Sequence, residues 1–396
     1  MKKVRLCDIA TVITKGTTPT TLGYNFVDDG VNFVKIESIT ENGEFLTDKF
    51  AHITDECDRK LSRSQLQRND LLFSIAGAIG RTAIVTEDIL PANTNQALAI
   101  IRVPEGEVDY SYLKYVLQSP AIVEQFEKKK QGVAQLNISL KDIGDFVIPL
   151  RTAEEQKTVI STLDKVSELI ALRKEQLVKL DQLVKSRFIE LFGDPMDNPM
   201  GWKIETLKKA TTKIGSGATP KGGKESYQAE GITLIRSMNV HDGRFEYKDL
   251  AHITDEQAKQ LDNVTVEEND VFINITGASV ARSCIVPKHI LPARVNQHVA
   301  IIRCITTILN PVFANQMFLN ASFKGQLLDI GESGGATRQA ITKQQLETLT
   351  VILPPLERQE QFATFVEQTD KSKLAIQQSL DKLELLKKSL MQEYFG

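Results

Sequence analysis

The sequence predicts an α+β protein made of two tandem mixed α/β domains, each followed by a long helix. Two observations lead to this fold class: a segment of about 200 residues is repeated, and each copy ends in an apolar seven-residue period. The chain has 396 residues, enough for two domains that each bury a core. We expect mixed domains at 1–150 and 194–350, and long helices at 151–193 and 351–396.

The repeat consists of identical peptides in the same order. The hexapeptide AHITDE at 51–56 recurs unchanged at 251–256. Further matched peptides are Asn69-Asp70 with Asn269-Asp270, Leu90-Pro91-Ala92 with Leu291-Pro292-Ala293, and Asn95-Gln96 with Asn296-Gln297. So much identity at so long a period indicates duplicated domains rather than a solenoid.

Each mixed domain combines short strands with a helix. In the first copy, β-branched runs between Gly, Pro and Asn predict strands at 31–39, 70–75, 81–85 and 97–103. Residues 110–130 have apolar side chains in a helical rhythm, so one helix is predicted there.

The long helices are predicted at 152–192 and 357–394. The first contains no Gly or Pro, and Thr152 with Glu155 fits a capping box. Both helices have a seven-residue period, at Leu163, Ile170, Leu177, Val184 and Leu191 in the first and at Phe362, Thr369, Ile376, Leu383 and Leu390 in the second. Further apolar residues, including Leu169, Leu183 and Leu386, are expected to flank this seam. A helix of 40 residues is roughly 60 Å long, and its apolar seam needs a partner. We expect the two helices to pair antiparallel about a pseudo-two-fold axis; the alternative is that each packs only on its own domain.

Composition excludes several classes of protein. The N-terminus reaches Asp8 before any apolar stretch, and the longest apolar run, 97–101, is too short to cross a membrane. We therefore expect a cytoplasmic protein. The four cysteines and five histidines form no ligand cluster, so the cysteines are expected to be small, buried and reduced, and no metal site is predicted. The net charge is −3 and no segment is strongly basic, so any DNA footprint must be a local patch or be shared with a partner.

Several local motifs accompany this architecture. Long-helix starts carry Glu154-Glu155-Gln156 and Glu360-Gln361, and the mid-chain loop reads Leu191-Phe192-Gly193-Asp194-Pro195. Gly132-Val133-Ala134-Gln135 and Gly335-Ala336-Thr337-Arg338 each precede the end of a mixed domain. With these motifs and the duplication, the whole chain resembles the specificity subunits of type I restriction-modification systems.

The resemblance implies a DNA reader without a catalytic site or cofactor of its own. Each mixed domain would be a target-recognition domain for one half of a bipartite double-stranded DNA site, and the helices would set the unread spacer and dock two modification subunits. Those subunits would bind S-adenosylmethionine and methylate adenine N6, while restriction subunits would use ATP and magnesium for translocation and cleavage; no membrane is implied. Asn310-Pro311-Val312-Phe313 faintly resembles an adenine-methyltransferase motif but lacks its second Pro, which argues against an enzyme. A two-headed scaffold that binds proteins instead of DNA stays open.

Candidate DNA contacts lie in three loops of each domain and beside one strand. Base reading uses Arg or Lys for guanine and Asn or Gln for adenine, and Gly, Ser and Thr loops approach phosphates. The candidates are Lys15, Thr17, Thr18, Lys35, Ser74, Arg81 and Gln135 in the first domain and Ser216, Thr219, Lys221, Arg236, Asn274, Arg282, Thr337 and Arg338 in the second. Alternatively the loops are plain turns and Arg81 and Arg282 form internal pairs. Asn95-Gln96 and Asn296-Gln297 are expected to hold the fold.

Overall fold

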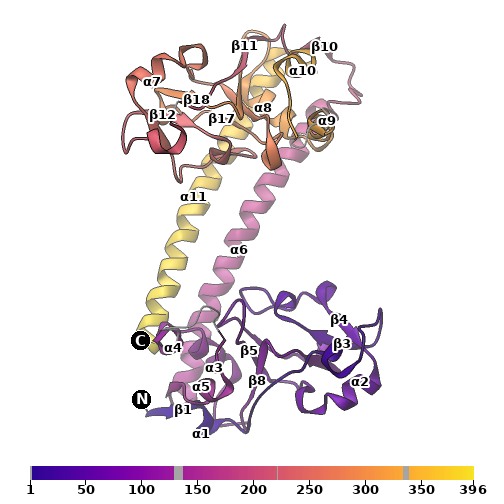
Figure 1. Cartoon of the computed structure of the whole chain (residues 1–396), viewed down its shortest axis with the longest axis vertical. Coiled ribbons are helices and arrows are strands. Elements are labelled where there is room, and N and C mark those ends of the chain that lie inside the picture. Colours follow the sequence, from indigo (N-terminus) through magenta and orange to yellow (C-terminus); the bar gives the residue numbers. More distant parts are fainter. Residues whose placement is uncertain (1, 129–136, 221, 333–338) are drawn as a thin grey trace. The chain divides into compact units, whose positions relative to one another are not determined.

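The protein folds into two compact units. The computed structural model describes residues 2–128, 137–220, 222–332 and 339–396. Unit 1 comprises Met1–Lys174 with Gln378–Gly396, and unit 2 comprises Glu175–Gln377 (Figure 1). Each unit therefore contains one mixed domain and about half of each long helix, so the units divide the chain inside the helices.

The described residues of unit 1 form three small sheets. They are a four-stranded antiparallel sheet in the order β2-β8-β5-β6, a three-stranded sheet β4-β3-β7, and the pair β1-β9. The strands are β1 (Lys2–Arg5), β2 (Val12–Lys15), β3 (Val31–Val34), β4 (Ala51–Ile53), β5 (Leu71–Ser74), β6 (Thr82–Ile84), β7 (Ala92–Thr94), β8 (Leu98–Arg102) and β9 (Val147–Leu150). The four predicted strand regions of this domain are all present, although the first is shorter than expected because a 3-10 turn, Ile36–Ser38, follows β3.

Unit 2 repeats this topology. Its sheets are β11-β19-β16-β17, β15-β12-β18 and β10-β20, with a short extra hairpin β13-β14. The strands are β10 (Lys203–Thr206), β11 (Thr211–Ser216), β12 (Ile232–Ile235), β13 (Val240–His241), β14 (Arg244–Phe245), β15 (Ala251–Ile253), β16 (Val271–Asn274), β17 (Ser283–Ile285), β18 (Ala293–Val295), β19 (Val299–Cys304) and β20 (Thr350–Leu353). The duplication inferred from the sequence is therefore a duplication of the fold.

Short helices cover the sheets. They are α1 (Leu6–Ile9), α2 (Asp55–Lys60), α3 (Tyr110–Leu117), α4 (Pro120–Glu127) and α5 (Leu140–Gly144) in unit 1, and α7 (Asp255–Lys259), α8 (Pro311–Leu319), α9 (Ala321–Glu332) and α10 (Lys343–Thr348) in unit 2. The single helix predicted at 110–130 is wrong, because it is divided into α3 and α4. Ser119 caps α4 by accepting a hydrogen bond from the amide of Ile122, and Pro120 at the first position has no amide hydrogen to continue α3.

The long helices are α6 (Ala153–Phe192) and α11 (Leu356–Phe395). The predicted capping box is present: the backbone amide of Thr152 donates to Glu155 Oε2 at 2.9 Å, and the amide of Glu155 donates to Thr152 Oγ1 at 3.4 Å. A reciprocal cap satisfies two amides that the first helical turn leaves without partners.

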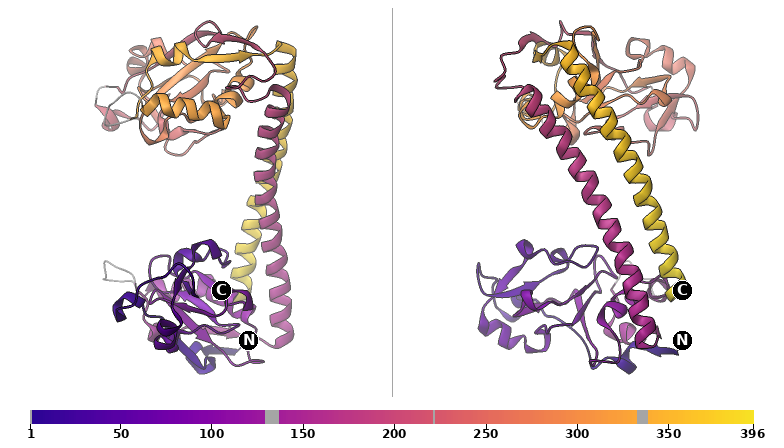
Figure 2. Two further views of the ribbon diagram at one scale, coloured as in Figure 1. Left: turned by 90° about the vertical axis from the view of Figure 1, so that its right-hand side faces the viewer. Right: turned by 180° about the vertical axis from the view of Figure 1, so that it is seen from behind.

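The two long helices pair antiparallel within each unit (Figure 2). In unit 1, Lys174 of α6 binds Glu384 of α11 at 3.0 Å, and Arg151, just before α6, donates to the carbonyl of Tyr394. In unit 2, Lys373 of α11 binds Asp181 of α6 at 2.6 Å. Higher numbers in α6 thus meet lower numbers in α11, which confirms the predicted pairing, and the alternative of separate packing is wrong.

The buried seam is narrower than predicted. Leu163 and Phe362 are fully buried, as expected for seam positions. Leu169, Leu183 and Leu386, which were expected beside the seam, are instead 43%, 48% and 46% exposed. The paired helices therefore leave apolar side chains exposed, which also include Leu172, Val178, Ile189, Leu374 and Leu385.

One cysteine differs from the sequence expectation. Cys57, Cys284 and Cys304 are buried, but Cys7 is exposed. Burial raises the pKa of Cys284 and Cys304 to about 12, so their reactive thiolate form is scarce at pH 8.

We expect an aromatic disulfide reagent to label one thiol, Cys7, rapidly in the native protein. The variant C7S should lack this rapid phase. After denaturation, all four thiols of the parent chain should react. Rapid labelling of a second thiol in the native chain would contradict this assignment.

Candidate nucleic-acid interface

In unit 1 several polar loops meet at the carboxyl edge of two parallel strands. β3 and β7 are parallel, with Val34 opposite Thr94. Lys35 and Asn95-Gln96 follow these strands directly and therefore leave the sheet at the same edge. We call this place, with residues 16–18, 35, 75–76 and 95–97, the loop edge of unit 1.

The first candidate loop is fastened to this edge by a glycine and a threonine. A Cβ on Gly16 would lie 1.8 Å from the carbonyl oxygen of Thr94, so only glycine allows the approach. The Thr18 hydroxyl donates to Gln96 Oε1. Gly16 therefore has a structural role, because it allows this close approach, whereas Thr18 is partly exposed at the loop edge.

The second candidate loop and Ile138, which follows the third, reach the same edge. The amide of Ile75, at the end of β5, donates to the carbonyl of Ala97 at 2.9 Å, and the amide of Ile138 donates to the carbonyl of Ile75 at 3.1 Å. Ile138 lies just after the third loop. The structure therefore brings the described anchors of all three loops together at one edge.

Unit 2 has a corresponding loop edge, at residues 217–219, 236, 275–276 and 296–298. Gly217 donates its amide to the carbonyl of Asn296 at 3.1 Å, and Thr219 donates its hydroxyl to Gln297 Oε1. The amide of Ile275 donates to the carbonyl of His298 at 2.9 Å. The two edges share one backbone arrangement and carry different side chains, as expected if they read different sequences.

Four predicted contacts lie outside the described residues: Gln135, Lys221, Thr337 and Arg338. Lys15 and Ser216, which end β2 and β11, are partly exposed, and so is Thr17 in the first loop of unit 1. Their contact with DNA stays a prediction.

Lys35 and Arg236 take corresponding positions after β3 and β12 and are partly exposed. The Lys35 ammonium lies 4.3 Å from the centroid of the Phe26 ring, and the Arg236 guanidinium lies 5.4 Å from that of Tyr227. Arg236 also donates to the carbonyl of Asp249. An aromatic ring holds each cation in place while part of it faces solvent.

Ser74 and Asn274 are fully buried. Ser74 Oγ donates to the carbonyl of Ala76 at 2.9 Å, and Asn274 Nδ2 donates to the carbonyl of Ser237 at 2.9 Å. Both side chains thus bond to the protein's own backbone, which speaks against the predicted base contact for these two residues.

Sequence reasoning missed the exposed glutamines of the loop edges. Asn95 and Asn296 hold their turns as expected, because their Oδ1 atoms accept the amides of Ala97 and His298 at 3.0 Å. Gln96 and Gln297, however, are exposed. The repeated Asn-Gln dipeptide was the available signal, but it does not reveal which of its two side chains points outward.

In unit 2 a chain of hydrogen bonds extends from this glutamine. Gln297 Nε2 lies 3.1 Å from His298 Nε2, and His298 Nδ1 contacts Thr276 Oγ1. Since an amide nitrogen only donates, a hydrogen bond between Gln297 Nε2 and His298 Nε2 requires that this ring nitrogen accept. Unit 1 has Ala97 and Ala76 at these places, so the two edges offer different donors.

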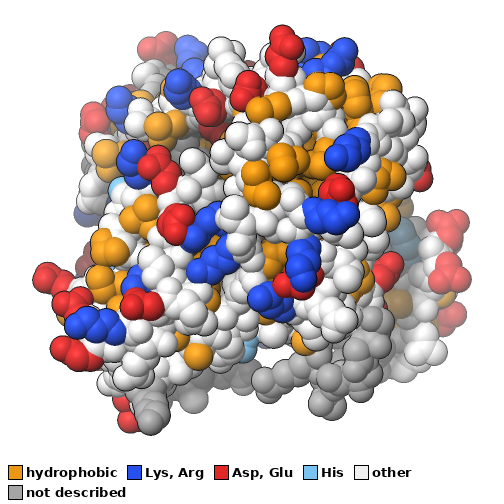
Figure 3. Space-filling view, turned by 90° about the horizontal axis from the view of Figure 1, so that it is seen from above, with side chains coloured by type: hydrophobic (Ala, Val, Ile, Leu, Met, Phe, Trp, Pro, Cys, Tyr) orange, Lys and Arg blue, Asp and Glu red, His pale blue; other side chains and the backbone are white. Residues whose placement is uncertain are grey.

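Charged side chains show no dominant sign on the face seen from above. In Figure 3, Lys and Arg side chains are interspersed with Asp and Glu. This pattern agrees with the net charge of −3 and with a local rather than a broad basic footprint.

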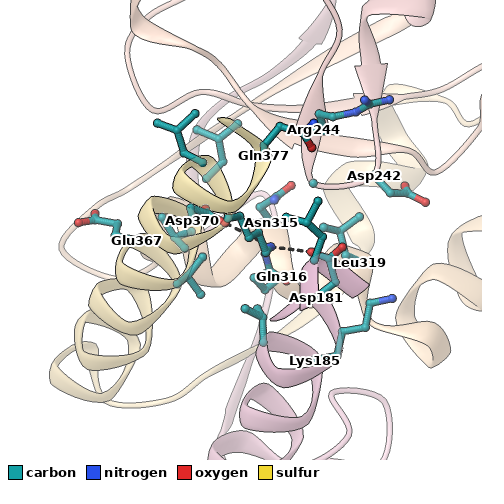
Figure 4. Close-up of a pocket in the computed structure, with 18 residues that line it drawn as sticks. Asp181, Lys185, Asp242, Arg244, Asn315, Gln316, Leu319, Glu367, Asp370 and Gln377 are labelled. Atoms are coloured by element: carbon teal, nitrogen blue, oxygen red, sulfur yellow. Dashed lines mark ion pairs between the residues drawn. The ribbon is translucent and has the colours of Figure 1, made fainter. Parts of the chain in front are cut away.

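A pocket of about 800 Å³ in unit 2 lies between the long helices, α8 and the β13-β14 hairpin (Figure 4). Lys373 on its wall binds Asp181 at 2.6 Å and Asp370 at 3.3 Å. This paired cation fastens α11 to α6 and is therefore a structural feature of the pocket. Within the described ranges we find no group of three or more His, Cys, Asp or Glu residues that could hold a metal ion, and no helix apolar enough over sufficient length to cross a membrane.

The sequence matches a known family model twice. The model, described as the type I restriction modification DNA specificity domain, covers residues 1–182 and 199–385. The chain belongs to this family. The resemblance noted from the motifs is thereby confirmed, and each match includes one mixed domain and most of the long helix that follows it.

Individual relatives carry matching descriptions. The Escherichia coli type I restriction enzyme EcoBI specificity subunit is 31% identical over 142 residues, which is 35% of this chain and 29% of that protein. The EcoAI specificity subunit of the same species is 28% identical over 199 residues, 48% of this chain and 32% of that protein. These two matches therefore span only about a third of each relative. A Methanocaldococcus jannaschii protein assigned as a type I MjaX specificity subunit is 24% identical over 98% of this chain and 90% of its own length.

Solved structures share the fold. A chain from a study of complex assembly and conformational transition of the type I system superimposes with a TM-score of 0.62 at 19% identity, covering 99% of this chain and 96% of that one. The type I S subunit from M. genitalium gives 0.56 at 14% identity, covering 100% and 96%. The predicted fold class is confirmed.

Proposed function

We propose that this specificity-family chain reads DNA for a type I restriction-modification complex, each unit reading one half of a bipartite site. The observation that carries this proposal is the pair of loop edges. In both units the described anchors of three loops lie at the carboxyl edge of a parallel strand pair, and the described exposed residues of these edges differ in part between the units. A shared framework with different polar groups suits two readers with different targets.

The paired helices would set the spacer and dock two modification subunits. Each helix is continuous over 40 residues and contributes to both units, so the pair would serve as the spacer element between the two readers. The apolar side chains left open on the pair, among them Leu183 and Leu385, would pack against apolar helices of these partners.

The chemistry would belong to the partners. The modification subunits would bind S-adenosylmethionine and methylate adenine, and the restriction subunits would hydrolyse ATP with magnesium. This chain would contribute no catalytic group and would act with the host DNA in the cytoplasm. A near-neutral reader fits this division, because the partners can supply much of the phosphate contact.

The test is methylation mapping by single-molecule sequencing in cells that express this chain with its modification subunit. We expect a methylated motif of two short blocks around a fixed degenerate gap, absent when this chain is omitted. If the assembled complex gives no such motif, the DNA-reading proposal fails, and a two-headed scaffold that binds proteins becomes the better hypothesis.

A further inference from the structure

Arg81 and Arg282 occupy the same position of the same turn in the two units. In unit 1 the amide of Ser74 donates to the carbonyl of Arg81 at 2.8 Å, closing the turn between β5 and β6. In unit 2 the amide of Asn274 donates to the carbonyl of Arg282 at 2.9 Å, closing the turn between β16 and β17. The two arginines can therefore be compared directly.

In unit 1 the arginine is occupied by the protein itself. Arg81 Nη1 donates to the carbonyl oxygens of Ile36 and Ile39, at 3.2 and 2.7 Å. These carbonyls lie at the start and just past the end of the 3-10 turn that follows β3, so Arg81 ties that turn to the turn between β5 and β6. The neighbouring Ser74 side chain bonds elsewhere, to the carbonyl of Ala76.

In unit 2 an asparagine performs this task. Ser237, at the start of the 3-10 turn that follows β12, and Val240, just past its end, are the counterparts of the two isoleucines. Asn274 Nδ2 donates to their carbonyl oxygens at 2.9 and 3.4 Å. Because Asn274 is fully buried and bonds to both, no arginine is needed there.

The guanidinium of Arg282 is consequently not used to hold the 3-10 turn of its own unit. Among the described residues its guanidinium has no hydrogen-bond or ion-pair partner, and the side chain is partly exposed. Its turn begins at the loop edge, where Ile275 bonds to His298. A guanidinium offers a fork of N–H donors that matches paired acceptors in bidentate geometry.

We propose that Arg282 contacts DNA through paired acceptor atoms, that Asn274 leaves it free to do so, and that Arg81 has no equivalent role. The inference rests on the proposed DNA-reading function and adds which unit carries the arginine contact. The acceptors are either O6 and N7 of guanine or the oxygens of a backbone phosphate, which have the same donor requirement.

The experiment uses the full chain assembled with its modification subunit and compares the parent with R282A, R282K, N274S and the charge control K288A. Lys288 is exposed and lies before the amino end of β18, opposite the loop edge. DNA affinity at several salt concentrations, the methylated motif and the melting temperature are measured for each variant. We expect R282A to bind its motif about ten- to a hundredfold more weakly, while K288A changes affinity less than about twofold.

The two acceptor sources give different results. With guanine, R282A and R282K both relax one base of the second half-site and leave the first half-site unchanged. With phosphate, the motif is unchanged, R282K retains most of the affinity, and R282A lowers the salt slope by about one. N274S removes the donor from the two carbonyls and draws Arg282 onto them, so it should weaken binding as R282A does.

Two results would overturn the inference. R282A could keep the parent's affinity and motif, whatever its melting temperature. N274S could also bind as the parent does, which would remove the role assigned to Asn274. In each case the parent complex still methylates a bipartite motif; if the parent gives none, the proposed function itself fails.

Discussion

Seven residues inserted into both long helices at matched levels are expected to lengthen the unread spacer by about three base pairs. One heptad adds about 10.5 Å of helix and preserves the seam, and DNA rises about 3.4 Å per base pair. The insertions follow Leu177 in α6 and Gln377 in α11, near the level where Lys373 binds Asp181. Methylation should be slower, because three base pairs also rotate one half-site by about 100°.

A four-residue insertion near Ala171, in α6 alone, is the contrasting variant. Four residues do not complete a heptad, so the seam residues after the insertion turn away from α11. We expect this variant to lose assembly or to change the spacer. Methylation mapping reads both variants, and an unchanged gap in an assembled complex with matched insertions would rule out the helices as the ruler.

The duplication and the long helices were predictable because both are written in local sequence. Identical peptides at a constant offset require no knowledge of contacts, and a capping box such as Thr152 with Glu155 involves residues three apart. The gathering of loops at one edge was only partly predictable. The three loops were singled out by their polar residues, but their common location follows from the parallel pairing of β3 with β7, which is a long-range contact.

What the sequence could not supply is the partner of each polar side chain. Arg81 and Arg282 are the same residue type at matched positions, yet one bonds to carbonyls and the other does not, because of a Ser-to-Asn difference seven or eight residues earlier. The prediction of which apolar residues of the long helices are buried was partly wrong for a related reason. A seven-residue period identifies an apolar stripe but not its width, so the exposure of Leu169 and Leu183 appears only once the helices are paired.

Replacement of Phe362 by alanine is expected to cost unit 2 about 3–5 kcal/mol. Phe362 on α11 is fully buried, with its ring centroid 5.6 Å from that of Phe188 and 5.5 Å from that of Phe192 on α6. Phe192 in turn lies 4.8 Å from Phe313 on α8. The alanine would leave a cavity where both long helices meet the mixed domain.

The expected loss corresponds to a fall in melting temperature of roughly 6–20 °C for a unit of this size. Leu374→Ala is the matched control, since Leu374 lies on the same helix in the same unit and is 61% exposed. Its removal should change the free energy of unfolding by less than about 0.5 kcal/mol. If α11 did not contribute to the core of unit 2, F362A and L374A would have the same melting temperature. A large difference would mean that the first half of α11 is part of that core, as expected of a helix that positions a DNA-reading domain.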